Sequence, residues 1–286
     1  MLMTLTAAFW AGNFVIGRAV TAGTVPPFTL AWARWAGASL VILPFALPYL
    51  WRDRRAIGAR LGFLFVLGAM GAGLFNTLQY VALQSMTAVT GSVINSAGPV
   101  LIALACWMIL GERPRIVQFL GIVLSLAGVL YVVARGDFTQ LPSLGQSIGE
   151  LLMLLGLIMW GVYTALMRFR PVTHALSFAA VTYLVAALVN TPLMLWEQAA
   201  RPPLELAPPM LMAIAYVAIF PGLLAYLFFN LAVESIGGTR ASAFFHLTPL
   251  FTALLATVFL DEPWQLYHAA GFALILAGVW ITARGS

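Results

Sequence analysis

The stretch that decides the fold runs from Thr87 to Arg135 and reads TAVTGSVINSAGPVLIALACWMILGERPRIVQFLGIVLSLAGVLYVVAR. It predicts an apolar helix over 88–110, a short turn, and a second apolar helix over 116–134. The same pattern returns 150 positions later, without a gap, over residues 237–285. The matched pairs include Ser92 with Ser242, Pro99 with Pro249, Glu112 with Glu262 and Gly121 with Gly271. The chain is therefore predicted to contain two copies of one unit.

The composition indicates a membrane protein. Of the 286 residues, 62% are hydrophobic and only 8% are charged, and the mean hydropathy is +0.98. A soluble domain carries about 25% charged residues. The single cysteine, Cys106, excludes an internal disulfide. No metal-ligand spacing is evident, and neither a metal nor a cofactor is expected. The sequence also shows no pattern of a removable signal peptide.

Apolar runs long enough to cross a bilayer recur along the whole chain. They lie near 2–21, 28–50, 61–83, 88–110 and 116–134, and near 148–168, 174–196, 209–232, 239–260 and 265–283. This predicts an all-α polytopic protein with ten transmembrane helices. Residues 1–136 form the first five-helix repeat, 137–146 a linker, and 147–286 the second. Because five is odd, the second repeat must be inverted.

Arginine placement predicts the orientation in the membrane. All basic residues are arginine, and the net charge is +5. Most of them fall on one side of the predicted topology: Arg52, Arg54, Arg55, Arg60, Arg113, Arg115, Arg168, Arg170, Arg240 and Arg284. By the positive-inside rule both termini are cytoplasmic, in a bacterial inner membrane. Membrane orientation explains the basic charge, so no nucleic-acid partner is expected.

Polar and aromatic residues share faces on six of the predicted helices. Such groups are costly in hydrocarbon and usually face a cavity. The candidate substrate-binding residues are Trp10, Asn13, Asn76, Gln79, Tyr80, Asn95, Trp160, Tyr163, Tyr226, Asn230 and His246. Helix–helix hydrogen bonding and core packing are the alternative for each. Arg34 is expected to be structural, either snorkelling outward or bonding helix-end carbonyls. Glu112 and Glu262 are expected to be turn or cap residues.

Prolines and glycines inside the predicted helices are candidate hinges. Proline removes one backbone hydrogen bond and kinks a helix. The hinge candidates are Gly71, Gly73, Pro99, Pro221, Gly222 and Pro249. Fixed curvature that opens a cavity is the alternative. The glycines of 116–134 and 265–283 are spaced seven apart, which predicts close-packing faces.

These features together resemble a known family. The residues that carry the resemblance are Trp10–Phe14, Arg34, Gly111–Glu112 and Asp261–Pro263, within two five-helix units. The ordered set is similar to the EamA family of the drug/metabolite transporter superfamily, and most like its YddG-type amino acid exporters. The resemblance covers essentially the whole chain. It implies a carrier of small metabolites, often an exporter.

The acidic residues narrow the substrate class. All nine lie in loops or at helix ends of the predicted topology, which disfavours cationic drugs and carboxylate-based proton coupling. Neutral or zwitterionic solutes fit better, in particular hydrophobic and aromatic amino acids. A buried His246 is expected to be neutral at physiological pH, which favours facilitated transport (uniport) over proton coupling. Two fused repeats can form the whole pathway in a monomer, and a dimer is not excluded.

Three alternatives remain open at the level of the sequence. A proton-coupled metabolite or drug exporter is the nearest. A channel or a non-transporting scaffold is disfavoured, because the polar faces and the candidate hinges occur at equivalent places in both repeats. An integral-membrane enzyme would rest on Gly145–Gly149, which matches G-x-S-x-G but follows no strand. Ser147–Glu150 is better interpreted as a capping box.

Overall fold

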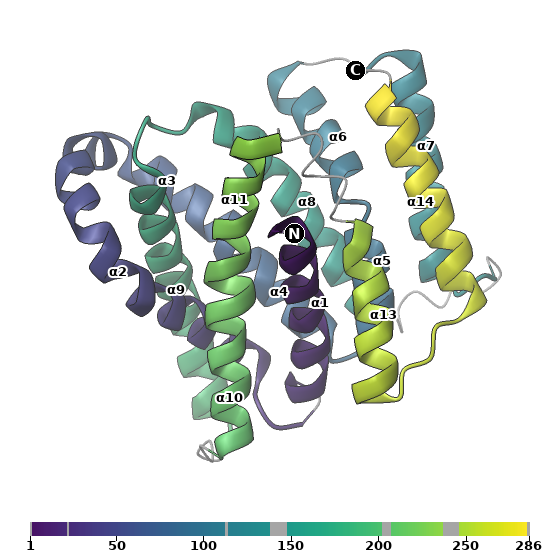
Figure 1. The fold of residues 1–286 in the computed structure, drawn as a ribbon, viewed down its shortest axis with the longest axis horizontal. Coiled ribbons are helices and arrows are strands. Elements are labelled where there is room, and N and C mark those ends of the chain that lie inside the picture. The colour runs from purple at the N-terminus through teal and green to yellow at the C-terminus, as the bar shows by residue number, and fades with distance from the viewer. Residues whose placement is uncertain are drawn as a thin grey trace.

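The computed structural model describes residues 2–21, 23–111, 114–137, 148–201, 207–236 and 246–284. Within these ranges all regular secondary structure is helical, which confirms the all-α class. The helices form one elongated bundle, in which α1 (Leu2–Thr21) starts and α14 (Leu266–Arg284) ends in the upper half of the view (Figure 1).

The remaining elements follow in chain order. In the first half they are α2 (Pro27–Ala59), α3 (Leu61–Leu67), η1 (Gly68–Leu74), α4 (Phe75–Ala82), α5 (Ala88–Asn95), α6 (Gly98–Leu110) and α7 (Ile116–Val133). In the second half they are α8 (Ile148–Leu166), η3 (Met167–Phe169), α9 (Ala175–Ala199), α10 (Pro208–Val217), η4 (Ala218–Leu224), α11 (Ala225–Ile236) and α13 (Leu247–Leu260).

Several of these elements meet the requirements of a membrane span. Six helical stretches of the described chain are long and apolar enough to cross a bilayer. They are Pro27–Ala59, Leu61–Ala82, Ile116–Val133, Ile148–Phe169, Ala175–Ala199 and Pro208–Phe229. The bent pair α5–α6 brings the number to seven if it forms one span, and α13 and most of α14 are shorter apolar helices. The protein is therefore polytopic.

Two predicted elements differ from the structure. The helix expected over 88–110 is broken between Asn95 and Gly98, and its halves meet at 41°. Pro99 explains the break, because it has no N–H and its ring clashes with the carbonyl four residues earlier. The connection expected between the apolar runs 28–50 and 61–83 is helical as far as Ala59, since α2 continues to that residue in spite of Pro44 and Pro48.

Two π-helical segments occupy equivalent places in the two halves. η1 spans Gly68–Leu74, and η4 spans Ala218–Leu224. These bounds are related by the 150-residue offset of the sequence repeat. The hinge candidates Gly71 and Gly73 lie in η1, and Pro221 and Gly222 lie in η4. Pro249 instead lies near the start of α13. π-Helical turns are rare and are often found at functional sites.

The two halves exchange equivalent contacts. α1 packs against α11 and α13, and α8 packs against their counterparts α4 and α6. The Thr6 hydroxyl donates to the Ala225 carbonyl at 3.4 Å. At the matching place, a Cβ atom added to Gly156 would lie 3.5 Å from the Phe75 carbonyl oxygen. Each half therefore completes the packing of the other.

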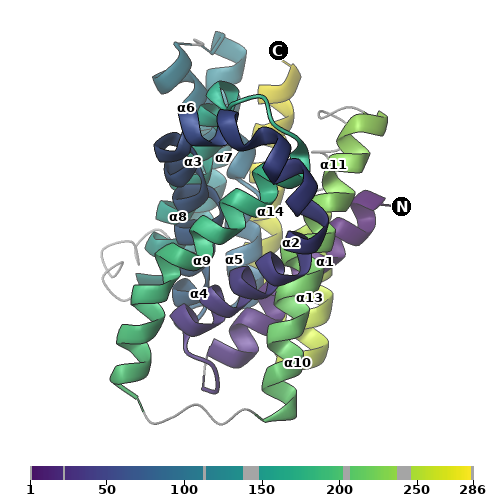
Figure 2. The same cartoon turned by 90° about the vertical axis from the view of Figure 1, so that its left-hand side faces the viewer.

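The edges of the bundle consist of equivalent helices paired with each other. α2 and α9 form one edge and cross in Figure 2, and α7 and α14 form the opposite edge in Figure 1. A Cβ atom on Gly121 would lie 2.6 Å from the Gly278 carbonyl oxygen, and one on Gly128 would lie 2.8 Å from that of Gly271. Since rising numbers on α7 meet falling numbers on α14, these helices are antiparallel. The predicted close-packing role of the glycines is confirmed.

We predict that Gly121→Ala and Gly128→Ala each lower the free energy of unfolding by about 1–3 kcal/mol, because the new methyl groups meet backbone atoms that cannot rotate away. Thermal unfolding in detergent measures the effect. Gly62→Ala in α3 is the control, since its Cβ atom would meet nothing within 4 Å. The control should be neutral or stabilising by up to about 1 kcal/mol. An equal loss in all three variants would contradict the close packing of α7 and α14.

Candidate functional site

A buried arginine lies where four helical elements meet. Arg34, on α2, is only 2% exposed. Its Nη1 atom donates to the Asn13 side-chain oxygen on α1 at 2.6 Å and to the Tyr80 hydroxyl on α4 at 3.1 Å. Its Nη2 atom donates to the carbonyl oxygen of Pro221 in η4 at 3.3 Å. The Tyr80 hydroxyl in turn donates to Asn13 at 2.6 Å. Elements from both halves are therefore joined through one side chain.

This placement corrects the sequence expectation for Arg34. The side chain does not snorkel outward. It does bond a carbonyl, but one inside a π-helical segment rather than at a helix end. In hydrocarbon every backbone polar group needs a partner. The sequence gives no sign of which carbonyl the π segment leaves unpaired, so this role could not be read from it.

Aromatic rings continue from the arginine toward α1 and α11. The guanidinium carbon of Arg34 lies 4.9 Å from the centre of the adjacent Trp35 ring. The Trp35 ring contacts Tyr183 of α9 at 5.0 Å and Tyr226 of α11 at 6.4 Å, measured between ring centres. Tyr226 also contacts Trp10 at 6.1 Å. The candidates Trp10 and Tyr226 thus belong to one cluster, which also includes Trp35 and Tyr183.

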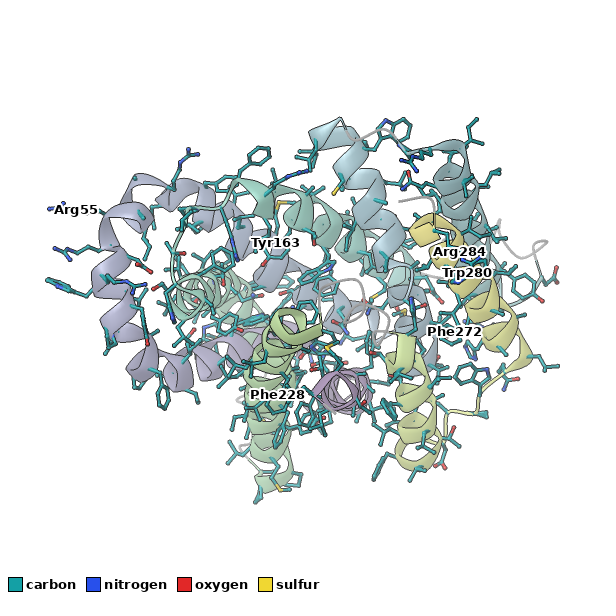
Figure 3. The ribbon with its side chains drawn as sticks, turned by 45° about the horizontal axis from the view of Figure 1, so that its top comes forward. Arg55, Tyr163, Phe228, Phe272, Trp280 and Arg284 are labelled. Atoms are coloured by element: carbon teal, nitrogen blue, oxygen red, sulfur yellow. The ribbon has the colours of Figure 1, made fainter. Side chains whose placement is uncertain are left out.

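A second aromatic group approaches the first from α8. The Trp160 ring lies between Phe75 and Tyr163, at 5.2 Å and 5.1 Å between ring centres. Tyr163 packs on Gly71 in η1, where a Cβ atom would lie 2.5 Å from the ring. Figure 3 places Tyr163 within the bundle, whereas Arg55 points outward at its edge. Ala72 of η1 belongs to the same hydrophobic cluster as Tyr183, against which Tyr226 packs, so the second aromatic group lies beside the first.

Other candidates do not join this cluster through direct contacts. The Asn76 side chain donates to the Ala72 carbonyl of its own helix at 3.1 Å. Gln79 is buried on α4, and Asn95 is half-buried at the break before α6. His246 immediately precedes α13, and its buried Nδ1 atom has no partner. The Asn230 side chain lies outside the described part of the chain, as do Glu112 and residues 145–147.

Two carboxylates cap helix N-termini, and a third, Glu150, is buried beside a pocket. Glu262 accepts from the Ala88 backbone N–H at 2.8 Å and pairs with Arg18 at 3.1 Å, which confirms its predicted role as a cap residue. Glu197 caps the start of α2 by accepting from the Thr29 backbone at 2.7 Å. Glu150 is 3% exposed, and one of its oxygens has no partner.

Glu150 lines a small pocket near the ends of α1, α4 and α7. The pocket has a volume of about 170 Å³ and also contains Arg18, Arg135, Thr90 and Tyr267. Composition gave no reason to single out this carboxylate, because it occupies an ordinary first-turn position of α8. Within the described residues, no group of three potential metal ligands occurs.

We predict that Asn13→Ala destabilises the protein by about 1–3 kcal/mol, because it leaves a hydrogen on the buried guanidinium without an acceptor. Thermal unfolding in detergent provides the measurement. Asn76→Ala is the matched control, since its amide bonds only within its own helix and its loss should cost less. The network would be contradicted by a larger loss in Asn76→Ala than in Asn13→Ala.

Comparison with known proteins supports a transporter. The EamA-like transporter family matches residues 1–134 and, separately, residues 147–284. An uncharacterized transporter of Archaeoglobus fulgidus is 28% identical over 288 residues, covering 99% of this chain and 96% of its own. The uncharacterized transporter YyaM of Bacillus subtilis is 29% identical over 77% of this chain and 72% of its own.

A solved structure shares the fold over nearly the whole chain. It is a crystal structure with a TM-score of 0.64 and 21% sequence identity, covering 98% of this chain and 95% of its own. With family matches over both halves of a polytopic helical bundle, the chain belongs to the EamA-like transporter family and is a multi-pass membrane transporter.

Proposed function

We propose that the protein is an alternating-access carrier for small hydrophobic and aromatic amino acids. The observation that carries this proposal is a pair of aromatic groups, Trp10 with Tyr226 and Trp160 with Tyr163. The first reaches Arg34 through Trp35, and the second packs on Gly71 of η1. Aromatic walls provide contact area, and a few polar groups orient a solute. The carboxylates that form ion pairs within the described residues, Glu262 and Asp53, pair with Arg18 and Arg52 outside this cluster, and a neutral or zwitterionic solute suits the cluster better than a cationic drug.

The architecture that we propose has ten spans in two inverted units, 1–136 and 147–286, joined by the linker 137–146. The antiparallel glycine contacts of α7 and α14 support it, because equivalent helices of an inverted repeat run in opposite directions. The matching π segments, with Gly71, Gly73, Pro221 and Gly222, are the proposed hinges. Pro99 at the α5–α6 bend and Pro249 in α13 complete the set. Alternating access then consists of each half adopting the other's shape.

We predict opposite accessibility for cysteines placed in equivalent connections, in a variant without Cys106. Gly23→Cys, between α1 and α2, should react with a membrane-impermeant reagent from outside the cell. Val172→Cys, between η3 and α9, and Arg55→Cys should react only after permeabilisation, because arginine-rich connections stay in the cytoplasm. Both Gly23 and Val172 are exposed. Labelling of Gly23→Cys and Val172→Cys from the same side would exclude the inverted arrangement.

Proton coupling is the second candidate. The buried Glu150 favours it, because a carboxylate with an unpartnered oxygen beside a pocket can bind a proton. Uniport remains the first choice, since the pocket that Glu150 lines contains none of the rings of the aromatic cluster. An imposed pH gradient across proteoliposomes, with equal substrate on both sides, separates the two. Accumulation that requires the gradient and is lost in Glu150→Gln or His246→Ala would establish coupling.

We predict that Tyr226→Ala raises the apparent KM for counterflow of labelled L-phenylalanine at least about tenfold, because it removes a ring that contacts Trp10, Trp35 and Tyr183. Purified protein in proteoliposomes is the test system. Trp280→Ala is the control, because Trp280 is 55% exposed on α14. Counterflow itself distinguishes a carrier from a channel. Equal changes in both variants would remove the basis for this site.

A further inference from the structure

The charge on Arg34 has no balancing anion in the described part of the chain. Arginine stays protonated in proteins. The ion pairs present are Arg18 with Glu262 and Arg52 with Asp53. The groups that contact Arg34 are an amide, a phenol and a peptide carbonyl, which carry only partial charges. A buried charge that lacks a counter-ion is costly, so a partner of opposite charge is expected at some stage.

The fold itself does not require a cation at this position. Residue 184, which matches Arg34 at the repeat offset, is a leucine that is 41% exposed. The equivalent segment η1 is π-helical without any arginine, and its carbonyls at Ala72 and Gly73 accept from the neutral side chains of Asn76 and Thr77. Neutral side chains therefore satisfy carbonyls in η1, where no arginine is present. Arg34 is an asymmetric feature of an otherwise repeated architecture.

The guanidinium retains donors that fit an anion. Of its five N–H groups, the two on Nη1 bond Asn13 and Tyr80, and one on Nη2 bonds Pro221. The Nε atom is buried and has no partner. One hydrogen on Nη2 is also unused. Nε and Nη2 share the edge of the guanidinium that a carboxylate binds with both oxygens.

The aromatic side chains around Arg34 indicate which chemical group would accompany the carboxylate of a bound anion. Trp35, Tyr183 and Tyr226 form the wall next to Arg34. Gly222 lies against the Arg34 side chain, since a Cβ atom there would be in ordinary contact with it at 3.7 Å. An apolar group attached to the carboxylate would contact these rings. The Nε atom is enclosed in this conformation, so the anion would enter when the walls separate.

We propose that Arg34 binds the carboxylate group of the transported solute, and that a carboxylate on an apolar or aromatic body is the feature the carrier selects. This inference rests on the proposed transport function and narrows its substrate class. The carboxylate takes the edge formed by Nε and Nη2, while Asn13, Tyr80 and the Pro221 carbonyl hold the guanidinium in place. The substrate then supplies the negative charge that the described residues around Arg34 do not provide.

The experiment is counterflow of labelled L-phenylalanine in proteoliposomes, in competition with two analogues. 3-Phenylpropionate keeps the carboxylate and lacks the amine, and L-phenylalaninol keeps the amine and lacks the carboxylate. The wild type should be inhibited by 3-phenylpropionate at least about tenfold more strongly than by phenylalaninol. Arg34→Gln should lose this preference, and Arg34→Lys should weaken it, because an ammonium cannot present two donors along one edge. Arg55→Gln removes an exposed charge from the same helix and should behave as the wild type.

The outcomes separate this inference from the proposed function. Transport of phenylalanine with equal inhibition by both analogues would overturn the role of Arg34 and leave the carrier intact. So would a preference that persists in Arg34→Gln. A wild type that transports no amino acid would overturn the proposed function, and this inference with it. Thermal unfolding of each variant checks folding. If Arg34→Gln does not fold, an unchanged preference in Arg34→Lys would count against the proposal.

Discussion

Arg34 stays protonated and lies buried between the two halves of a membrane protein. Its hydrogen bonds therefore limit where the neighbouring helices can lie. Arg34 is held by α1, α4 and η4 through an amide, a phenol and a backbone carbonyl. Isolating such a charge from water costs several kcal/mol even after relaxation. The three contacts reduce that cost and fix where α2 lies relative to both halves. The aromatic cluster of Trp10, Trp35, Tyr183 and Tyr226 is positioned as a consequence.

The need to satisfy backbone groups in hydrocarbon accounts for the other polar residues of the interior. A π-helical turn disturbs the regular ladder of hydrogen bonds, and side chains bond carbonyls in and beside the two segments: Thr6, Asn76, Thr77 and Arg34. At the edge formed by α7 and α14, glycines let the backbones of the two helices come into direct contact. The bundle thus combines two tightly packed edges with a centre that contains irregular helix.

Much of this could be predicted from the sequence, because it depends on local pattern. The repeat at offset 150, the apolar runs and the close-packing glycines are visible in single residues and their spacing. The bend near Pro99 was identified as a candidate hinge, but the break of the helix after Asn95 was not predicted. The helical extension to Ala59 was missed because the charged residues after Leu50 mark the end of the apolar run, whereas arginine and alanine are favourable in a helix that continues beyond it.

The centre of the site was harder to predict. Asn13 and Tyr80 were identified as polar groups in an apolar setting, and they are joined in the structure through Arg34. Arg34 itself was expected to be structural, either snorkelling outward or bonding helix-end carbonyls, since an arginine near a helix start can reach water or the ends of its neighbours. Its burial depends on a carbonyl 187 residues away in the chain. Trp35 and Tyr183 were overlooked because aromatic residues at helical spacing do not distinguish a lining from a core.

The two π-helical segments also record the history of the chain. A π-helical turn contains one residue more than the α-helical turn it replaces, so it corresponds to an insertion. The insertion occupies the same place in both halves, at Gly68–Leu74 and Ala218–Leu224, although the residues themselves differ. Two independent insertions at one position would be a coincidence. The irregular turn is therefore most simply explained as older than the duplication that produced the two halves, whereas the arginine at position 34, which position 184 lacks, marks a later divergence between them.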